Sequence, residues 1–219
     1  MSTSRAPAAT GDVTRLSIDV FKALAVFGTA TLHEAAGRIG ALPSAIKPVH
    51  SGMRVCGPAV TVRSPPGDNL WIHRAIYAAT PGDVLLVSTG GEFEYGYWGE
   101  IMSHAAATRK LGGLVIDGCV RDHMEIGKID FPVFARGLCI RGTGKDFGAL
   151  GWIGAPILVE DVRVQPGDAV IGDADGVVVL PATRAADTAA AAEAREARER
   201  EILDRLRAGE RTLDIYGLS

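Results

Sequence analysis

The stretch Gly113-Leu114-Val115-Ile116-Asp117-Gly118-Cys119-Val120-Arg121-Asp122 joins a fully apolar run to the densest group of polar side chains in the chain. A similar apolar run covers 84–87, a helical pattern covers 100–110, and a third apolar run covers 131–135 after a short helical pattern. Apolar strands that alternate with helices are typical of parallel βαβ units whose sheet is buried on both faces. The sequence therefore predicts an α/β fold with a parallel core.

The regions on either side of these runs differ from them in composition and in predicted structure. Residues 1–12 are small and polar and predict a mobile tail, and 13–219 predict a single domain. Thr31 followed by Glu34 has the spacing of a capping box, which predicts that a short helix begins at Thr31. Short strands follow 148, and a long helix is expected over 182–208. Its apolar face is mostly alanine, which favours packing along a neighbouring subunit.

Composition excludes several classes of protein. The net charge is −3, so no basic excess exists to hold a phosphate backbone, and we expect no nucleic-acid partner. No apolar run reaches membrane-spanning length, and no apolar leader is seen near the start, so no membrane association is expected. The three cysteines are odd in number and widely spaced. They predict no disulfide framework and favour a reducing, cytoplasmic location.

Arg121 and Asp122 follow the carboxyl end of an apolar strand, where parallel sheets bind ligands. An arginine can hold a carboxylate through two parallel hydrogen bonds. An aspartate can hold a hard cation such as Mg²⁺, which keeps several of its waters. This pair would suit a 2-oxo acid and a metal, and the alternative interpretation is a salt bridge that closes a loop.

A second polar cluster covers 95–100 and precedes a predicted helix. The free amides of a helix N-terminus suit an anion. Glu100 falls in the first turn, where a negative charge is favourable in any case, so it is open whether it has a function. A helix N-terminus and a strand end could meet at a single anion.

Other motifs fail on inspection. The segment 142–146 resembles a P-loop without the hydroxyl residue after Lys145, and 172–176 resembles an EF-hand loop that lacks later ligands. The histidines lack zinc-site spacing, and no lysine lies at an apolar position that would favour a Schiff base. Cys119 with His123 could form a nucleophile and base, although a buried loop cysteine is the simpler interpretation. Segment 87–91 only weakly suggests a methyltransferase.

Taken together, 97–100, 113–122 and 172–181 resemble the RraA-like family, and the resemblance extends over 29–217. The family includes class II pyruvate aldolases that act on 4-hydroxy-4-methyl-2-oxoglutarate and 4-carboxy-4-hydroxy-2-oxoadipate. The resemblance implies a layered α/β/β sandwich similar to the swivelling phosphohistidine domain. It also implies homotrimers, often stacked into hexamers, with active sites between subunits.

The resemblance also implies roles for individual residues. The aldolases carry an aspartate, then twenty residues, then Arg-Asp; here Arg121 and Asp122 match, and Glu100 stands in place of the first aspartate. By resemblance, Arg121 binds the pyruvyl group and Asp122 anchors Mg²⁺ or Mn²⁺. The backbone of Gly99, Glu100, Ile101 and Met102 would receive the substrate carboxylate. The neighbouring subunit would contribute Glu34 and a glutamate of the C-terminal helix, for which Glu199 and Glu201 both qualify.

The implied function is a metal-dependent lyase. It would cleave a 4-hydroxy-2-oxo acid to pyruvate and a second oxo acid through a metal-stabilised pyruvate enolate, and it would decarboxylate oxaloacetate through the same enolate. The alternative is a non-catalytic RraA-type protein that binds and inhibits ribonuclease E. In such proteins we expect the Arg-Asp pair to lack its aspartate, so Asp122 favours the enzyme.

Overall fold

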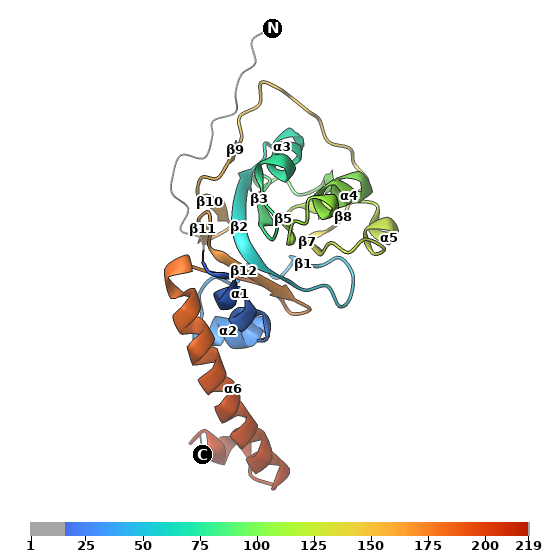
Figure 1. Ribbon diagram of the computed structural model, residues 1–219. Helices are drawn as coiled ribbons and strands as arrows, with labels where there is room; N and C mark the ends of the chain where they lie inside the picture. The colour runs from blue at the N-terminus through green and yellow to red at the C-terminus, as the bar shows by residue number, and fades with distance from the viewer. Residues whose placement is uncertain (1–15, 219) are drawn as a thin grey trace.

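The computed structural model describes residues 16–218, and the predicted tail 1–12 lies outside the described residues. Its main sheet has eight strands (Figure 1). Four central strands run parallel and are neighbours in the order β7, β5, β3, β2. The apolar runs of the sequence therefore form the parallel core that they predict. The bounds are β1 (Lys47–Pro48), β7 (Val133–Ala135), β5 (Gly113–Asp117), β3 (Val84–Ser88), β2 (Val55–Arg63), β12 (Ala169–Asp173), β13 (Gly176–Leu180) and β9 (Trp152–Ile153).

The two faces of the sheet are covered differently. Leu85 and Val87 of β3 pack toward α3 (Leu70–Ala78) and α4 (Glu100–Thr108). Val84 and Leu86 point the other way, into a core shared with β12, β13 and the hairpin of β10 (Ile157–Val159) and β11 (Val162–Val164). The sheet thus curls into a nearly closed, barrel-like form. The mixed α/β class is confirmed, and the likeness to the phosphohistidine domain stays a prediction.

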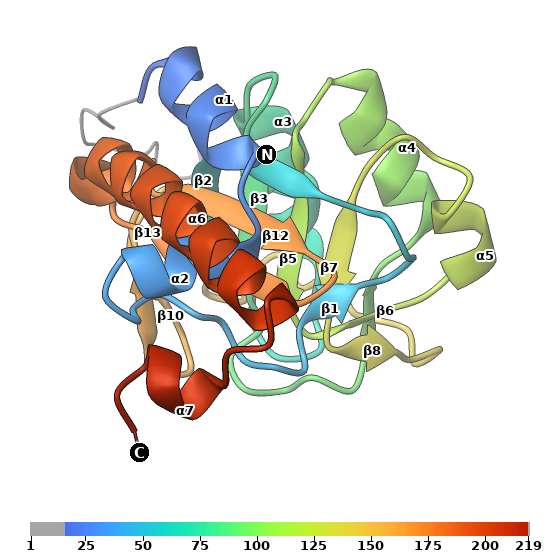
Figure 2. The ribbon, with the colours of Figure 1, turned by 90° about the horizontal axis from the view of Figure 1, so that it is seen from below.

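A separate helical layer packs on β12 and β13. It consists of α1 (Ile18–Ala25), α2 (Thr29–Ala35) and the first half of α6 (Ala185–Arg207), which follows the 3₁₀ turn η1 (Ala182–Arg184). The second half of α6 extends away from the body toward α7 (Thr212–Ile215) (Figures 1 and 2). The long predicted helix is therefore present, and its buried residues are Ala185, Thr188, Ala189 and Ala192.

The start of α2 corrects the sequence interpretation. The helix begins at Thr29, so Thr31 lies inside it and the predicted capping box is wrong. Asp173, the last residue of β12, caps the helix instead: its carboxylate accepts hydrogen bonds from the Thr29 amide at 2.8 Å and the Thr29 hydroxyl at 2.7 Å. A cap supplied from so far along the chain leaves no local signal in the sequence.

A small parallel sheet lies beside the main one and supports the polar clusters. It pairs β4 (Gly96–Trp98) with β6 (Cys119–Val120), and β6 with β8 (Gly137–Leu138). Because β4 and β6 are parallel, the segments that follow them emerge at the same edge. After β6 the chain passes Arg121 and Asp122 into the short helix α5 (His123–Ile126). Across residues 16–218, no helix is both long and apolar enough to cross a bilayer.

Candidate active site

The two polar clusters predicted from the sequence meet at the ends of β4 and β6. The Arg121 amide donates a hydrogen bond to the Trp98 carbonyl at 2.9 Å, which ties the two strand ends together. Asp122 Oδ2 then accepts a hydrogen bond from the Glu100 amide at 3.0 Å. The strand end and the helix N-terminus therefore form one site.

Asp122 is held in an unusual backbone conformation. Its φ of 60° lies in the left-handed region, which a non-glycine residue adopts at a cost. Arg121 Nε lies 3.7 Å from Asp122 Oδ2, and both side chains are partly exposed. The second carboxylate oxygen, Oδ1, accepts no hydrogen bond from residues 16–218. The loop salt bridge suggested by the sequence thus exists, but it leaves half of the carboxylate free.

Two glycines allow the strand ends to approach each other. A Cβ at Gly99 would lie 2.2 Å from Asp122 Oδ2, although the φ of Gly99, −159°, is one that any residue can adopt. A Cβ at Gly96 would lie 2.5 Å from the Cys139 carbonyl oxygen. Steric room, not backbone freedom, is what requires glycine at both positions.

The N-terminus of α4 is rigid and has free amides. Trp98 Nε1 donates to Ser103 Oγ at 2.6 Å, and the Ser103 hydroxyl donates to the Gly99 carbonyl at 3.1 Å, all within buried side chains. The amides of Ile101 and Met102 donate to no acceptor in the described part of the chain. Such amides at the positive end of a helix dipole suit a carboxylate.

A cavity of about 280 Å³ opens at this site. It gathers five of the residues predicted for substrate or metal binding: Gly99, Ile101, Met102, Arg121 and Asp122. It also includes polar residues that the sequence analysis missed, namely Asn69, His73, Thr143 and Lys145. Lys145 belongs to the segment that was set aside as a failed P-loop. The signal that could have found Asn69 and His73 is their spacing of one helical turn.

The added residues change the electrostatics of the cavity. Burial lowers the pKa of His73, the positive charge of Lys145 lowers it further, and Asp68 opposes the shift. Together these effects favour the neutral form of His73. Asn69 donates to the Tyr97 carbonyl at 2.9 Å, while its Oδ1 is buried without a hydrogen-bond partner in the described residues. The lining thus includes a histidine whose neutral form is favoured and an amide whose buried oxygen lacks a partner in residues 16–218.

Glu100 contributes its backbone, and its side chain lies elsewhere. The carboxylate is 3.9 Å from His104 Nε2 on the surface of α4, and Glu100 is not among the residues that line the cavity. The additional methylene, compared with the family aspartate, is consistent with this outward position.

Glu34 and Glu199 are not brought to the cavity within one chain. They belong to α2 and α6, which pack together away from α4 (Figure 2). Arg195 lies between them, with Nη1 3.8 Å from Glu34 Oε2 and Nε 2.9 Å from Glu199 Oε1. Glu201 lies on the same helix. A contribution to the site of a neighbouring subunit stays a prediction for all three glutamates.

The donor set can be compared with the needs of a metal ion. Among the described residues, no three His, Cys, Asp or Glu side chains cluster as a metal site. Mg²⁺ needs no such cage, because it is held by one or two carboxylates together with waters and substrate oxygens. The free Oδ1 of Asp122 at the cavity fits that pattern. The site is suited to a weakly held catalytic cation and unsuited to a structural one.

Comparison with known proteins places the chain in a family. The family model described as RraA-like (Aldolase/RraA) matches residues 29–179, which include every predicted site residue except those on α6. The chain belongs to the RraA-like family. Its fold is the family fold, and the motif at Arg121 and Asp122 lies within the matched region.

Individual RraA-like relatives carry different names. A protein of Halalkalibacterium halodurans named "Putative 4-hydroxy-4-methyl-2-oxoglutarate aldolase" is 34% identical over 90% of this chain and 94% of its own length. A crystal structure of an uncharacterized protein from Pseudomonas syringae pv. tomato has a TM-score of 0.81 at 28% identity, covering 95% and 98% of the two chains. The RNA-processing inhibitor RraA from Thermus has a TM-score of 0.64 at 26% identity, covering 71% and 93%.

Proposed function

We propose that this RraA-like protein is a divalent-metal-dependent lyase. It cleaves a 4-hydroxy-2-oxo acid, 4-hydroxy-4-methyl-2-oxoglutarate or 4-carboxy-4-hydroxy-2-oxoadipate, to pyruvate and a second oxo acid. Oxaloacetate decarboxylation is a second activity of the same site. The observation that supports this proposal is the convergence of free α4 amides, Arg121 and Asp122 on one cavity.

Each group at the cavity has a task in such a reaction. The free amides of Ile101 and Met102 bind the C1 carboxylate, and the Arg121 guanidinium donates hydrogen bonds to the pyruvyl oxygens. These amides and the guanidinium together hold the pyruvyl end of the substrate in one orientation within the cavity. Negative charge moves onto the pyruvyl oxygens as that bond breaks, and the same donors then bind more strongly.

Asp122 would hold the cation through Oδ1 while the Glu100 amide fixes Oδ2. When bound there, Mg²⁺ or Mn²⁺ supplies a positive charge beside the 2-oxo group. The 4-hydroxyl proton leaves to a water next to acidic side chains, and C3 of the resulting enolate then takes a proton from that water to give pyruvate. We assign the positioning of that water to Glu34 and to Glu199 or Glu201 of a neighbouring subunit, because none of the three lines the cavity of its own chain.

The direct test is pyruvate release, followed with lactate dehydrogenase, from each 4-hydroxy-2-oxo acid and from oxaloacetate. The wild type is measured with Mg²⁺, with EDTA, and after Mg²⁺ is restored. Asp122→Ala is compared with Asp130→Ala, an exposed aspartate of the following turn. We expect metal-dependent release that Asp122→Ala loses and Asp130→Ala keeps. Equal activity of the two variants would contradict the assignment.

The Thermus neighbour gives the second candidate, a protein that inhibits RNA processing. That function predicts specific binding to a ribonuclease and no dependence on Asp122 or on metal. If the wild type releases no pyruvate from any of the three acids and inhibits ribonuclease E as strongly as Asp122→Ala does, the inhibitor function is supported and the lyase is not.

A further inference from the structure

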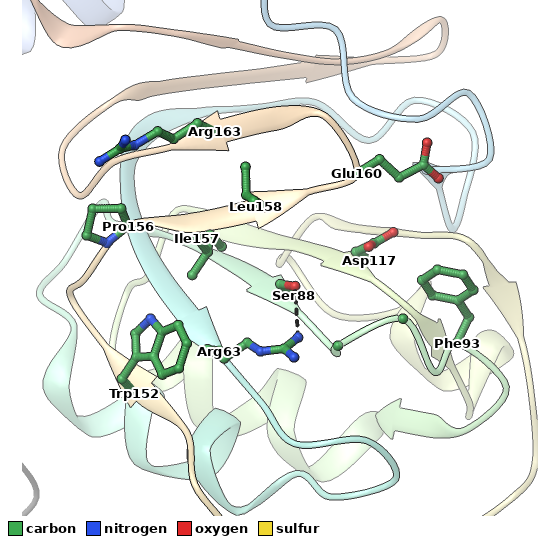
Figure 3. Close-up of a pocket in the computed structure, with 12 residues that line it drawn as sticks. Arg63, Ser88, Phe93, Asp117, Trp152, Pro156, Ile157, Leu158, Glu160 and Arg163 are labelled. Atoms are coloured by element: carbon green, nitrogen blue, oxygen red, sulfur yellow. Dashed lines mark hydrogen bonds between the residues drawn. The ribbon is translucent and has the colours of Figure 1, made fainter.

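A second cavity, of about 620 Å³, lies on the barrel side of the sheet and shares no lining residue with the first (Figure 3). We propose that it binds a small organic anion, a carboxylate that carries an aromatic or branched apolar group. The inference stands apart from the proposed lyase, because it uses other residues and another opening. Its volume lies in the usual range for small-molecule sites.

The cavity lies at the carboxyl ends of three neighbouring parallel strands. Arg63 ends β2, Ser88 ends β3 and Asp117 ends β5, and the three residues are direct partners in the sheet register. Parallel sheets bind ligands beyond the carboxyl ends of their strands, since loops there leave polar groups converging on one space. The row formed by Arg63, Ser88 and Asp117 therefore gives the cavity a polar floor.

The charges on this floor leave positive charge uncompensated. Arg136 lies 2.5 Å from Asp117 Oδ1 through Nε and 2.5 Å from Glu160 Oε1 through Nη2, so one arginine outside the lining engages both lining carboxylates. Within residues 16–218, Arg63 donates only to the Ser88 hydroxyl, at 3.3 Å. Neither Arg63 nor Arg163 forms an ion pair with a described residue. A ligand carboxylate would supply the partner that Arg63 lacks.

Gly90 fixes where the Arg63 guanidinium lies. Its φ of 80° is in the left-handed region, and a Cβ there would lie 2.6 Å from Arg63 Nη2 and 2.7 Å from Nη1. Only glycine lets the guanidinium rest against this loop. Gly91 follows with a φ of 87° and also lines the cavity. The loop and the arginine thus form a preorganised anion-binding corner, which limits the ordering cost of binding.

Apart from Glu160 and Arg163, the remaining lining is apolar or glycine. Trp152 and Phe93 stand at two ends of the cavity, and Ile157 and Leu158 of the β10–β11 hairpin lie along a third side (Figure 3). Trp152 is 38% exposed and Leu158 is 60% exposed, so both can present apolar surface to a ligand. An aromatic or branched group would cover this surface while its carboxylate meets Arg63. The chemistry therefore favours an amphipathic acid over an inorganic anion.

The test is calorimetric titration of the full chain with benzoate, 3-phenylpropionate and 4-methylpentanoate, with benzamide as the neutral counterpart of benzoate. Arg63→Gln removes the proposed anchor, and Arg198→Gln removes one exposed charge from α6 as the matched control. We expect at least one acid to bind in preference to benzamide. Arg63→Gln should weaken that binding about tenfold or more, and Arg198→Gln should leave it unchanged.

Further measurements keep the test decisive. Arg163→Gln serves as an exposed second variant if Arg63→Gln does not fold, as judged by its circular dichroism and Tm. Pyruvate release by Arg63→Gln should match the wild type, so failure of the lyase proposal would be seen separately. Three results would overturn the inference. They are binding of none of the acids, equal binding by the wild type, Arg63→Gln and Arg163→Gln, or binding that depends on Asp122 instead.

Discussion

Asp117 ends β5 and Asp122 follows β6, five residues later in one short motif, and the structure puts the two aspartates to different uses. The Asp117 side chain is 5% exposed and paired with Arg136, whereas that of Asp122 is 36% exposed with one oxygen free. Burial raises the pKa of Asp117, and the hydrogen bond and charge of Arg136 oppose the shift. Two acids in one short motif thus differ by environment: the first stabilises the fold, and the second is available to a ligand.

The two cavities show the same contrast. The smaller one has free amides, an arginine and a partly free carboxylate, which together suit a substrate that must be held and polarised. The larger one has apolar walls and carboxylates that are already paired, which suits binding without chemistry.

Replacing Arg121 tests its proposed role in the smaller cavity. Arg121→Ala should lower kcat/KM for pyruvate release about a hundredfold or more, because the donors to the developing negative charge are lost. The side chain is 49% exposed, so Tm should change little. Steady-state kinetics and a thermal melt check this. Partial recovery with added guanidine hydrochloride at low concentration is expected, and full activity of the variant would contradict the role.

Replacing Asp117 tests whether this aspartate stabilises the fold. Asp117→Asn should lower the free energy of unfolding by about 2 kcal/mol, because the partly buried Arg136 loses one of its two carboxylate partners. Urea unfolding measures this, with Glu160→Gln as the more exposed comparison at the same arginine. Pyruvate release by the folded variant should be retained. A loss of activity with unchanged stability would reverse the assignment of the two aspartates.

Gly99 tests how closely Asp122 must be held. Gly99→Ala should lower kcat about tenfold, because its Cβ would lie 2.2 Å from Asp122 Oδ2 and displace the carboxylate. Gly142→Ala is the matched control, since Gly142 lines the same cavity with nothing within 4 Å of its Cβ. Equal kinetics for the two variants would show that the position of this carboxylate does not matter.

The cap on α2 predicts a pH dependence. Burial disfavours the charged form of Asp173, but hydrogen bonds from Thr29 and the Asp175 amide outweigh it and hold the pKa below its ordinary value of 3.8. The stabilisation is therefore present above that value and is lost as the pH falls through the lower, folded-state pKa. Asp173→Asn should cost about 1 kcal/mol at pH 7.

The measurement for Asp173 is Tm against pH for the wild type, Asp173→Asn and Asp175→Asn. The difference between wild type and Asp173→Asn should shrink as the pH falls below 3.8, the ordinary value. Asp175→Asn, whose exposed side chain belongs to the same turn, should follow the wild type. A difference that does not vary with pH would show that the carboxylate charge is not what caps the helix.

The smallest effect concerns His73. Lys145→Gln should raise the pKa of His73, because the lysine charge disfavours the protonated ring. Titration of the His73 ring proton by NMR checks this, with Lys128→Gln as control, since Lys128 pairs with Glu125 at 2.7 Å. An unchanged His73 pKa in Lys145→Gln would show that the lysine charge does not act on the histidine.

Local patterns in the sequence explain much of this fold. The apolar runs around Val115 gave the parallel core, and Arg121 and Asp122 were found from their place after a strand. The two-residue strand β6 is too short for any periodic pattern. The Asp173 cap and the approach of Lys145 to His73 depend on distant parts of the chain. Such contacts exist only after folding, so no spacing in the sequence records them.

The most direct test of the central claim is Mn²⁺ binding, followed by electron paramagnetic resonance with and without pyruvate. The wild type is compared with Asp122→Asn and Asp130→Asn. The account predicts that the wild type and Asp130→Asn bind Mn²⁺, that pyruvate strengthens binding, and that Asp122→Asn loses it. Equal Mn²⁺ binding by all three proteins, or none by the wild type, would contradict a cation site at Asp122.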